Sequence, residues 1–552
     1  MAVPYSFRRL ALTVEGRFLV ILPSMRRLAL LAFAAILSAP AFAQSATTPA
    51  SHCASLTSLA LDHAKITAAS LTTPATAIPG VKIPAALIAH LPAFCRVTIE
   101  DHPSPDSDIQ TEVWLPVTGW NGKYRGQGNG GFAGLISYDR LAAAILEGYT
   151  TAGTDTGHVG ALGNFALGHP EKVKDFGWRA IHDMTLEAKQ ITAAFYGKAP
   201  AHSYFSSCSD GGREALMEAQ RFPTDYDGIV AGAPAYNWTA LISTAALGGK
   251  LLHASATSNI PASKLPAIAS AVRAACDAKD GVTDGILNDP TQCHFDPAVL
   301  TCKQGDADTC LLPEQVAVLK SFYAPKLDEH GNKVYAGMLP GAEDAPGAWN
   351  SWIIGDKSSM LFYSTGYFTN FVYEQPDWKL ASFEFPRDYK LATVKTGAAL
   401  NATDPNLTPF LSRGGRLILY HGWADPGIPA LGTIDYYNAV AFTVGQKLTQ
   451  DSVRLYMVPG MLHCGGGPGA TIFGENEAGP RSDAQHDVFT ALEQWVEDDK
   501  APGTLIATKF NDNDPAKPVA MTRPLCVYPA ESKYTGGDSN DAKSFVCTAP
   551  QR

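Results

Sequence analysis

The chain has 552 residues, of which 46% are hydrophobic and 17% are charged, and its formal net charge is −10. This length exceeds what one simple core usually holds, so we expect a large domain with at least one insertion or second domain. An acidic chain without a basic stripe does not fit an electrostatic nucleic-acid binder, and we expect no nucleic-acid partner.

The first 43 residues have the pattern of an upstream extension followed by a secretory signal peptide. Met25-Arg26-Arg27 is a basic start, residues 28–37 are an apolar run, and Ala41-Phe42-Ala43 fits a small-x-small cleavage site. We therefore expect Met25 to be the true start. A membrane anchor is the alternative, but the apolar run is shorter than the roughly 20 residues that a bilayer span needs. The sequence predicts an exported protein, periplasmic or extracellular, that does not act on a membrane.

Export favours oxidation of the ten cysteines, which all follow the predicted cleavage site. Sequence order leaves Cys208 and Cys464 for each other after four local pairs, which are Cys53 with Cys95, Cys276 with Cys293, Cys302 with Cys310, and Cys526 with Cys547. Spacing alone does not establish this pairing, and zinc binding is the competing use, although no CxxC or HxxxH grouping favours it. If Cys208 and Cys464 are bridged, their neighbours Ser209 and His463 lie a few ångströms apart.

The distribution of strands and helices predicts an α/β protein. Residues 44–90 are rich in Ala, Thr and Pro and are expected to be a loosely ordered lead-in. From about Phe94, short β-rich runs alternate with helical stretches, as in a mostly parallel sheet covered by helices. The strand candidates are residues 112–116, 149–152, 203–205, 228–231, 416–420 and 453–458, and the clearest helices are residues 181–196 and 484–496.

The alternation of strands and helices stops between residues 236 and 410. This segment contains four cysteines, several tryptophans (Trp349, Trp352 and Trp378) and acidic loops. We therefore predict a catalytic domain formed by residues 44–235 and 411–552, with residues 236–410 inserted as a lid.

A candidate nucleophile lies where a predicted strand leads into a helix. Residues 205–214, Phe-Ser-Ser-Cys-Ser-Asp-Gly-Gly-Arg-Glu, follow a short strand. The helix after them has an inner side formed by Ala215, Leu216, Ala219 and Phe222. A strand, a tight turn of small residues and a helix are the setting of a nucleophile elbow, from which the Ser209 hydroxyl would project. The usual Gly-x-Ser-x-Gly pattern would have glycine where this chain has Ser207, so a plain turn or helix cap is the alternative.

Two later strands are each followed by a residue that would complete a catalytic set. Asp425 follows the strand of residues 416–420, and His463 lies in a glycine-rich loop after the strand of residues 453–458. The chain order Ser, Asp, His is that of α/β-hydrolases, in which the histidine accepts the serine proton and the aspartate orients the imidazole. Three other histidines are interpreted as structural, the last of them near enough to Asp425 to line the pocket: His158, His182 and His421.

Acyl transfer also requires hydrogen-bond donors for the oxyanion. The backbone amide of Asp210, directly after the serine, is the natural first donor. The second is expected from the glycine run of residues 128–134 after a strand near Tyr124, with Gly130 and Gly131 as equal candidates. A phosphate-binding loop is the competing use of these glycines, but the G-x-G-x-x-G spacing before a helix is not convincing.

These motifs resemble the tannases and feruloyl esterases, a family that also contains mono(2-hydroxyethyl) terephthalate hydrolases. The similarity spans about Cys53 to Cys547 and is carried by residues 208–213, 218–223, 226–234, 421–425 and 463–464. Its specific mark is the arrangement Cys-Ser, Asp, His-Cys with the two flanking cysteines bridged. The resemblance implies an α/β-hydrolase core, a lid over the active site and serine esterase chemistry.

An acidic loop in the predicted lid is a candidate calcium site. Residues 277–286 pack three carboxylates and two glycines between Cys276 and Cys293. Calcium prefers roughly 6–8 oxygen ligands in a curved loop, whereas a solvated acidic turn is the alternative. The family resemblance implies a structural Ca²⁺ bound by side-chain oxygens of Asp277, Asp280 and Asp284 and by carbonyl oxygens of Val282 and Ile286. We expect no organic cofactor.

The leading hypothesis is an exported serine carboxylesterase that hydrolyses esters of aromatic acids, such as gallate, ferulate or other hydroxycinnamates, through an acyl-enzyme. A terephthalate-monoester hydrolase is a second hypothesis, which the absence of arginine between Arg273 and Arg387 disfavours because a free carboxylate would need a clamp. Two hypotheses of a different class are a thiol-redox protein that uses Cys208 or Cys464 and a calcium-stabilised binding protein on an inactive hydrolase fold.

Overall fold

The computed structural model describes residues 48–73, 81, 83–475 and 482–549. The predicted upstream extension and signal peptide lie outside these residues. Residues 47–552 form one compact unit, and all elements described below belong to it.

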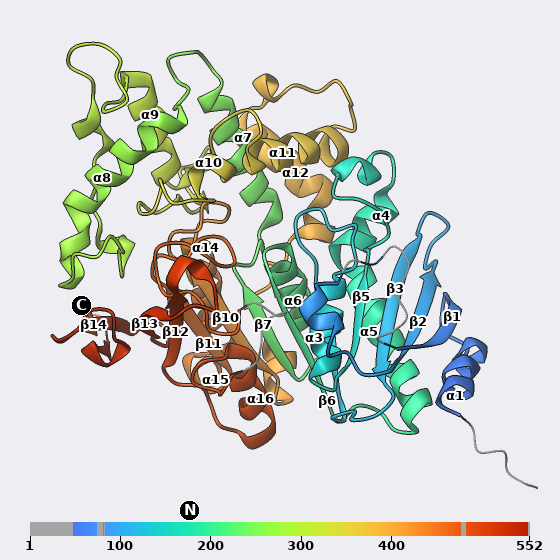
Figure 1. Cartoon of the computed structure of the whole chain (residues 1–552). Helices are drawn as coiled ribbons and strands as arrows, with labels where there is room; N and C mark the ends of the chain where they lie inside the picture. Colours follow the sequence, from blue (N-terminus) through green and yellow to red (C-terminus); the bar gives the residue numbers. More distant parts are fainter. Residues whose placement is uncertain (1–47, 74–80, 82, 476–481, 550–552) are drawn as a thin grey trace, which may run out of the picture. The chain divides into compact units, whose positions relative to one another are not determined.

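A nine-stranded sheet runs through the molecule in the order β1-β2-β3-β5-β4-β6-β7-β10-β11 (Figure 1). The strands are β1 (Ala64–Thr72), β2 (Phe94–Asp101), β3 (Ile109–Pro116), β4 (Lys123–Gln127), β5 (Thr150–Thr154), β6 (His202–Cys208), β7 (Gly228–Gly232), β10 (Arg416–Gly422) and β11 (Val453–Val458). The pairs from β1 to β5 along the order are antiparallel, and the pairs from β5 through β4 to β11 are parallel. This confirms the predicted mostly parallel sheet, with the β4–β5 exchange and strand order of an α/β-hydrolase.

The central strands of the sheet are buried along nearly their whole length. Every residue of β5 and of β7 is buried, and β10 is buried after Arg416. Such strands show a continuous apolar run rather than alternation, which is typical of parallel sheets. The strand candidates of the sequence coincide with β3, β5, β6, β7, β10 and β11, and β7, β10 and β11 have the clearest apolar runs.

The prediction of a loosely ordered lead-in is wrong for much of residues 48–73. Helix α1 (Pro49–Ser55) is tied to β2 by the Cys53–Cys95 disulfide, and β1 is the edge strand of the main sheet. Only Ile66, Ala69 and Thr72 of β1 are buried, and the register shifts between Ile66 and Ala68. This bulge breaks the period-2 alternation, so the strand has no clear sequence pattern.

The helices of the hydrolase core are α2 (Ala85–Ile88), α3 (Tyr138–Leu146), α4 (Pro170–Lys174), α5 (Ala180–Tyr196), α6 (Asp210–Arg221), α14 (Leu431–Val444), α15 (Gln446–Ser452) and α16 (Val488–Asp498). The sequence predicted that only one side of helix α6 is buried. In the structure every residue from Asp210 to Ala219 is buried, and Phe222, just after the helix, is half-buried. Helix α16 begins four residues later than the sequence predicted, because the Asp487 side chain accepts the Thr490 amide and caps the helix there.

The segment predicted as a lid is mainly helical, and Figure 1 shows the helices labelled α7 to α12 gathered together above the sheet. The helices of this segment are α7 (Trp238–Leu252), α8 (Leu265–Cys276), α9 (Pro313–Tyr323), α10 (Trp349–Trp352), α11 (Ser359–Tyr367), α12 (Phe385–Leu400) and α13 (Thr408–Ser412), with the short strands β8 (Lys326–Leu327) and β9 (Lys333–Tyr335). Part of this segment has a hydrophobic cluster of its own that includes Leu252, Ile268, Leu319 and Trp349. The domain boundaries at 235/236 and 410/411 remain a prediction.

Five disulfides connect the ten cysteines in the pairs suggested by sequence order. Cys526–Cys547 ties together two C-terminal hairpins, β12 (Leu505–Phe510) with β13 (Val519–Leu525), and β14 (Glu531–Tyr534) with β15 (Phe545–Thr548).

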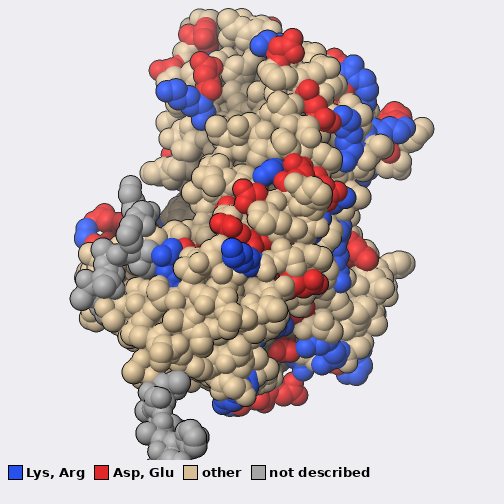
Figure 2. Space-filling model, turned by 90° about the vertical axis from the view of Figure 1, so that its right-hand side faces the viewer, with Lys and Arg blue, Asp and Glu red and all other residues tan. Residues whose placement is uncertain are grey.

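Within the described ranges, the helices are too short or too polar to cross a bilayer. On the face shown in Figure 2, acidic and basic side chains are interspersed.

Candidate active site

Ser209 lies in a strained turn between β6 and α6. Its backbone has φ 68° and ψ −122°, a conformation that non-glycine residues rarely adopt. The turn is tight because the following glycines lie against backbone and small side chains: a Cβ at Gly211 would lie 2.0 Å from the Ser207 Oγ, and one at Gly212 would lie 2.4 Å from the Gly232 carbonyl oxygen. The geometry is that of a nucleophile elbow, which presents the serine hydroxyl at the start of the helix.

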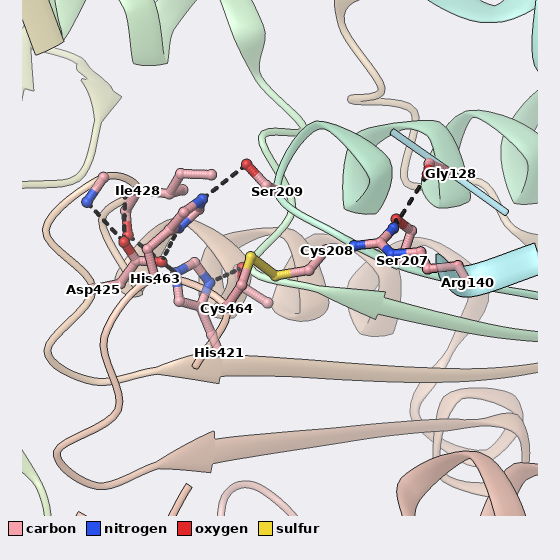
Figure 3. Close-up of a disulfide and its surroundings, with 12 residues drawn as sticks. Gly128, Arg140, Ser207, Cys208, Ser209, His421, Asp425, Ile428, His463 and Cys464 are labelled. Atoms are coloured by element: carbon pink, nitrogen blue, oxygen red, sulfur yellow. Dashed lines mark hydrogen bonds and ion pairs between the residues drawn. A yellow bond between two sulfur atoms is a disulfide. The ribbon is translucent and has the colours of Figure 1, made fainter. Parts of the chain in front are cut away.

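The structure explains how serine can occupy position 207. Ser207 is buried at the end of β6, and Gly128 opposite it leaves the space, since a Cβ at 128 would lie 2.7 Å from the Ser207 Cβ. Arg140 Nη1 donates to the Ser207 Oγ at 3.1 Å and to the Gly128 carbonyl at 3.2 Å (Figure 3). In the usual elbow, a glycine two residues before the serine leaves room for the turn. Here Gly128 and Gly211 leave that room instead.

Ser209, His463 and Asp425 form a continuous chain of hydrogen bonds (Figure 3). The Ser209 hydroxyl lies 2.8 Å from His463 Nε2, and His463 Nδ1 lies 2.8 Å from Asp425 Oδ2. Because ionised Asp425 only accepts hydrogen bonds, Nδ1 carries the proton, and Nε2 is the free base that faces the hydroxyl. Each residue follows the carboxyl end of its strand, namely β6, β10 and β11, and these ends meet at one edge of the parallel sheet.

Asp425 is buried and remains ionised. Burial by itself would raise the pKa of this carboxyl, but His463 and His421 beside it hold the pKa well below its usual range. His421 is itself fully buried, and it contacts Asp425 instead of lining the cavity that the sequence suggested.

The Cys208–Cys464 disulfide directly joins the residue before Ser209 to the residue after His463 (Figure 3). The two Cα atoms are 5.9 Å apart, although the cysteines are separated by 256 residues in sequence. Cys464 has a positive φ of 60°, so the bridge is made to a sharp turn of the histidine loop. The structure therefore has the serine and the histidine beside the two ends of one disulfide, as the sequence suggested.

The candidates for the oxyanion site lie beside Ser209. Asp210 is the first residue of α6, where backbone amides lack a helical acceptor, and its carboxylate is turned away into a buried ion pair with Arg213 Nε at 2.6 Å. Gly131 lines both cavities that meet at Ser209, whereas Gly130 lines only the larger one. A Cβ at Gly131 would lie 2.6 Å from the Tyr363 Oη, so the glycine allows the lid to approach closely.

A narrow apolar cavity lies on one side of Ser209. Its volume is about 60 Å³, and its walls come mainly from α7 and other parts of the lid segment and from residues 426–429. The side chains that give it an apolar and aromatic character are Trp238, Leu241, Phe322, Trp352, Met360 and Tyr363. Among the described residues that line it there is no lysine or arginine.

A wider cleft lies on the other side of Ser209, with a volume of about 1060 Å³. Its lining is more polar and includes Arg140, Thr471, Glu475, His486 and Asn513. Ser209 and His463 line both the cleft and the narrow cavity, so they lie where the two spaces meet.

Of the three lid tryptophans noted in the sequence, Trp352 alone lines these two cavities. Its ring contacts the His463 imidazole edge to face, with centroids 4.6 Å apart. Trp349 packs inside the lid with Phe322, and Trp378 stacks on Phe368. Sequence alone could not separate these roles, because all three occur in the same apolar lid segment.

The acidic loop of residues 277–286 is held in shape mainly by its own backbone amides. Asp277 accepts from the Gly285 amide at 3.0 and 3.1 Å, Asp280 accepts from Val282 at 3.0 Å, and Asp284 bonds Arg523 Nη2 at 2.6 Å. Burial raises the pKa of Asp280 to about 6, and the charges of Asp284 and Asp277 add to this effect. The donor set is one of hard oxygen atoms with excess negative charge, which fits calcium chemically.

A separate group could hold a metal ion, and the sequence did not indicate it. The ligand atoms of His182, Glu218 and Asp225 all lie within 4.8 Å of one another. Among the described residues, no other three His, Cys, Asp or Glu side chains come this close together. His182 Nδ1 lies 2.7 Å from Asp225 Oδ2, so two of the three already form a pair. These residues come from α5, α6 and the following loop, and their spacing has no motif.

The chain was compared with known proteins. It matches the family described as tannase and feruloyl esterase over residues 95–548. It is 39% identical over 492 residues to an uncharacterized esterase of Xanthomonas campestris pv. campestris, covering 84% of this chain and 85% of that protein. It is 33% identical to a probable feruloyl esterase B-2 of Aspergillus flavus, covering 78% of this chain and 83% of that protein.

The solved structures give the same result. Feruloyl esterase B from Aspergillus oryzae superposes with a TM-score of 0.83 at 28% identity, covering 91% of this chain and all of that one. Tannin acyl hydrolase from Aspergillus niger superposes with a TM-score of 0.70 at 22% identity, covering 91% and 95% of the two chains, and shares the fold. The chain therefore belongs to the tannase and feruloyl esterase family and is a carboxylic ester hydrolase with the α/β-hydrolase fold.

Proposed function

We propose that the protein is an exported serine esterase that hydrolyses esters of aromatic acids through an acyl-enzyme. The observation that carries this proposal is the hydrogen-bonded chain Ser209, His463 and Asp425 at the mouth of an apolar, aromatic cavity. Gallate, ferulate and other hydroxycinnamates are the acids that we expect, because a flat aromatic acyl group matches a narrow cavity lined by Trp352 and Tyr363.

In the proposed mechanism, the Ser209 oxygen attacks the ester carbonyl carbon while its proton passes to His463 Nε2. The carbonyl oxygen takes the negative charge and is bound by the backbone amides of Asp210 and Gly131, the glycine that lines both cavities. The intermediate collapses when the bond to the alcohol oxygen breaks and His463 returns the proton to that oxygen. A water molecule then repeats the sequence on the acyl-serine and releases the acid.

We assign the acyl group to the apolar cavity and the alcohol to the polar cleft. The two spaces meet at Ser209, so an ester seated across the serine has its two parts in different surroundings. The cleft is much the larger, about 1060 Å³ against about 60 Å³, and its polar lining suits a hydroxylated leaving group.

Two competing functions fit the site less well. A terephthalate monoester would carry a free carboxylate into the acyl cavity, whose described lining offers no lysine or arginine to pair with it. A non-catalytic binding protein has no use for a buried Asp425 aligned on His463, and that alignment favours catalysis.

The deciding experiment is an assay of the purified mature protein with methyl gallate, methyl ferulate and a terephthalate monoester. We expect turnover of at least one phenolic ester, and we expect Ser209→Ala to reduce kcat by about a thousandfold or more because no nucleophile remains. Full activity of Ser209→Ala would refute the serine mechanism. Failure of the wild type on every ester would favour the binding protein.

Export and calcium complete the proposal. Five disulfides are typical of proteins that fold in an oxidising compartment, which supports a periplasmic or extracellular location. We assign a structural Ca²⁺ to the lid loop, with Asp277, Asp280 and Asp284 as side-chain ligands and Val282 and Ile286 as carbonyl ligands. The carboxylates of Asp277 and Asp284 beside partly buried Asp280 support this assignment.

A further inference from the structure

Behind the acid Asp425 lies a second histidine, which the proposed mechanism does not use. His421 is on β10, and its imidazole is fully buried. His421 Nε2 lies 3.1 Å from Asp425 Oδ2 and 3.0 Å from the Ile428 carbonyl oxygen (Figure 3). His421 Nδ1 lies 2.7 Å from the Thr433 Oγ1 at the start of α14.

These partners determine which nitrogen of His421 carries the proton. The Ile428 carbonyl and the ionised Asp425 carboxylate can only accept, so Nε2 is a donor shared between them. Thr433 has a hydroxyl that can donate to Nδ1, which leaves His421 neutral. A neutral imidazole here also avoids a second buried cation beside the one that forms on His463 during turnover.

With this tautomer, Asp425 accepts four hydrogen bonds. Oδ1 accepts the amides of Gly427 at 2.7 Å and Ile428 at 2.9 Å, and Oδ2 accepts His463 Nδ1 at 2.8 Å and His421 Nε2 at 3.1 Å. Four donors saturate the lone pairs of a carboxylate and hold its plane. The oxygen that faces His463 can then neither rotate away nor act as a strong base.

We propose that His421 is a positioning residue: a neutral Nε2–H donor, fixed by Thr433, that aligns Asp425 Oδ2 on His463 and keeps the acid ionised throughout turnover. This inference rests on the proposed catalytic roles of Ser209, His463 and Asp425. His421 touches neither substrate nor reacting atoms, and it acts through the carboxylate.

Other titratable groups near Asp425 must be considered when a pH profile is interpreted. On the cavity side the titratable partner is His463. The Tyr335 phenol of β9 is close enough to feel the Asp425 charge. Its burial, and after it the neighbouring groups Tyr236, Asp425 and Asp435, hold the pKa of this phenol well above its usual range. Tyr335 therefore stays neutral over the pH range of the assay, and the acid limb reports on His463.

The test compares His421→Leu, which removes the donor, with His421→Gln, whose side-chain amide can donate from a similar position. We expect His421→Leu to lower kcat about tenfold to a hundredfold with little change in KM. Its acid limb of kcat/KM should move to higher pH by about half a unit, because Asp425 with one donor fewer attracts the His463 proton more strongly. His421→Gln should keep kcat within about threefold and keep the wild-type acid limb.

Controls separate positioning from packing. His169→Leu removes another histidine–carboxylate hydrogen bond, that to Asp106 at 2.7 Å, outside both cavities, and should leave kcat and the acid limb unchanged. Thr433→Val gives a second test if His421→Leu does not fold, and it should lower kcat about threefold to tenfold and displace the acid limb.

Two results would overturn the inference. One is a wild-type kcat and acid limb in His421→Leu, or in Thr433→Val where His421→Leu does not fold. The other is an equal loss of kcat in His421→Leu and His421→Gln with the wild-type acid limb, which would mean a packing role. Ser209→Ala is assayed in parallel: if it stays active, the proposed catalytic set fails, whereas if it is inactive, the histidine variants test only the role of His421.

Discussion

Ser209 has a backbone conformation that costs free energy, about 1–3 kcal/mol for a residue of this kind, and the surroundings maintain it. Gly211 and Gly212 allow the sharp turn, and the Ser209 amide donates to the Gly232 carbonyl at 3.0 Å. The strain places the hydroxyl at the start of α6 and directly opposite His463. This turn requires small residues around the serine, and it does not require the exact Gly-x-Ser-x-Gly pattern.

At the same scale, Trp352 is expected to determine which acyl groups react. Trp352→Ala removes the ring that packs on His463 and lines the acyl cavity, so kcat/KM for a phenolic ester should fall about tenfold or more. The value for an acetyl ester, which does not fill the cavity, should fall much less. The measurement is the ratio of kcat/KM for methyl ferulate and an acetate ester.

The matched control is Trp378→Phe, in the same lid but packed against Phe368 and Tyr373. It should leave the ratio unchanged. An equal loss on both esters in Trp352→Ala would contradict a role in acyl selection.

At the scale of elements, α6 and α5 carry more buried charge than the sequence pattern suggests. Asp210, Glu214 and Glu218 recur every four residues on α6 and are all buried. Burial raises the pKa of Glu214 to about 8, with the Asp210 charge as the next contribution. From an amphipathic pattern, one would predict that these three acidic residues lie on the exposed face of α6. They are buried because α6 packs inside the molecule.

A second group of buried acids gives a prediction on pH and stability. Glu187 of α5 lies near Asp101 of β2 and Asp183, and burial first and these charges second raise the pKa of Glu187 to about 9. Because the folded protein binds this proton more tightly than the unfolded chain, stability is lost as pH rises from about 4.5 to about 9. Glu187→Gln keeps the shape without the charge. It should raise the free energy of unfolding at pH 8 by about 1–3 kcal/mol relative to wild type and change it little at pH 4.5.

Urea unfolding of both proteins at the two pH values checks this expectation. Glu171→Gln is a control of opposite sign, because Lys174 and Arg179 lower the pKa of Glu171. If wild type and Glu187→Gln lose stability equally between pH 4.5 and 8, Glu187 is not held neutral by its surroundings.

On the scale of the whole molecule, the Cys208–Cys464 disulfide joins two segments 256 residues apart at the point where the site is assembled. We expect the double variant Cys208→Ser/Cys464→Ser to lower kcat about tenfold to a hundredfold, because the serine and histidine loops are no longer tied. Loss of so long a covalent loop should also lower the free energy of unfolding by about 2–5 kcal/mol.

Steady-state kinetics and urea unfolding measure the two effects. Cys302→Ser/Cys310→Ser removes a bridge with a sequence separation of 8 and should leave kcat unchanged. Normal turnover by the first double variant would show that the bridge does not position the site.

Calcium is expected to act on stability rather than on chemistry, since its proposed ligands lie in the lid loop and do not line the two cavities at Ser209. Treatment with EDTA should lower Tm by several degrees and leave kcat at 25 °C within about twofold. Metal analysis should find about one Ca²⁺ per chain, and Asp280→Asn should reduce that content. A calcium-free purified protein whose Tm is insensitive to added Ca²⁺ would refute the assignment.

Much of the fold could be predicted from the sequence because parallel strands covered on both faces are continuous apolar runs. The predicted strands at residues 416–420 and 453–458 coincide with β10 and β11, and Asp425 and His463 follow them as expected. Strand β1 was missed because a bulge and an exposed face remove its alternation. The group His182, Glu218 and Asp225 was also missed, because its members have no regular spacing.

The sequence by itself determined the residue types of the site, their chain order and the strands that they follow, because these depend on local patterns. Tertiary structure decided the rest. It selected Trp352 from three lid tryptophans, turned His421 onto Asp425 and divided the space at Ser209 into an apolar cavity and a polar cleft. These features depend on distances between segments far apart in the chain, which packing sets and which no local pattern records.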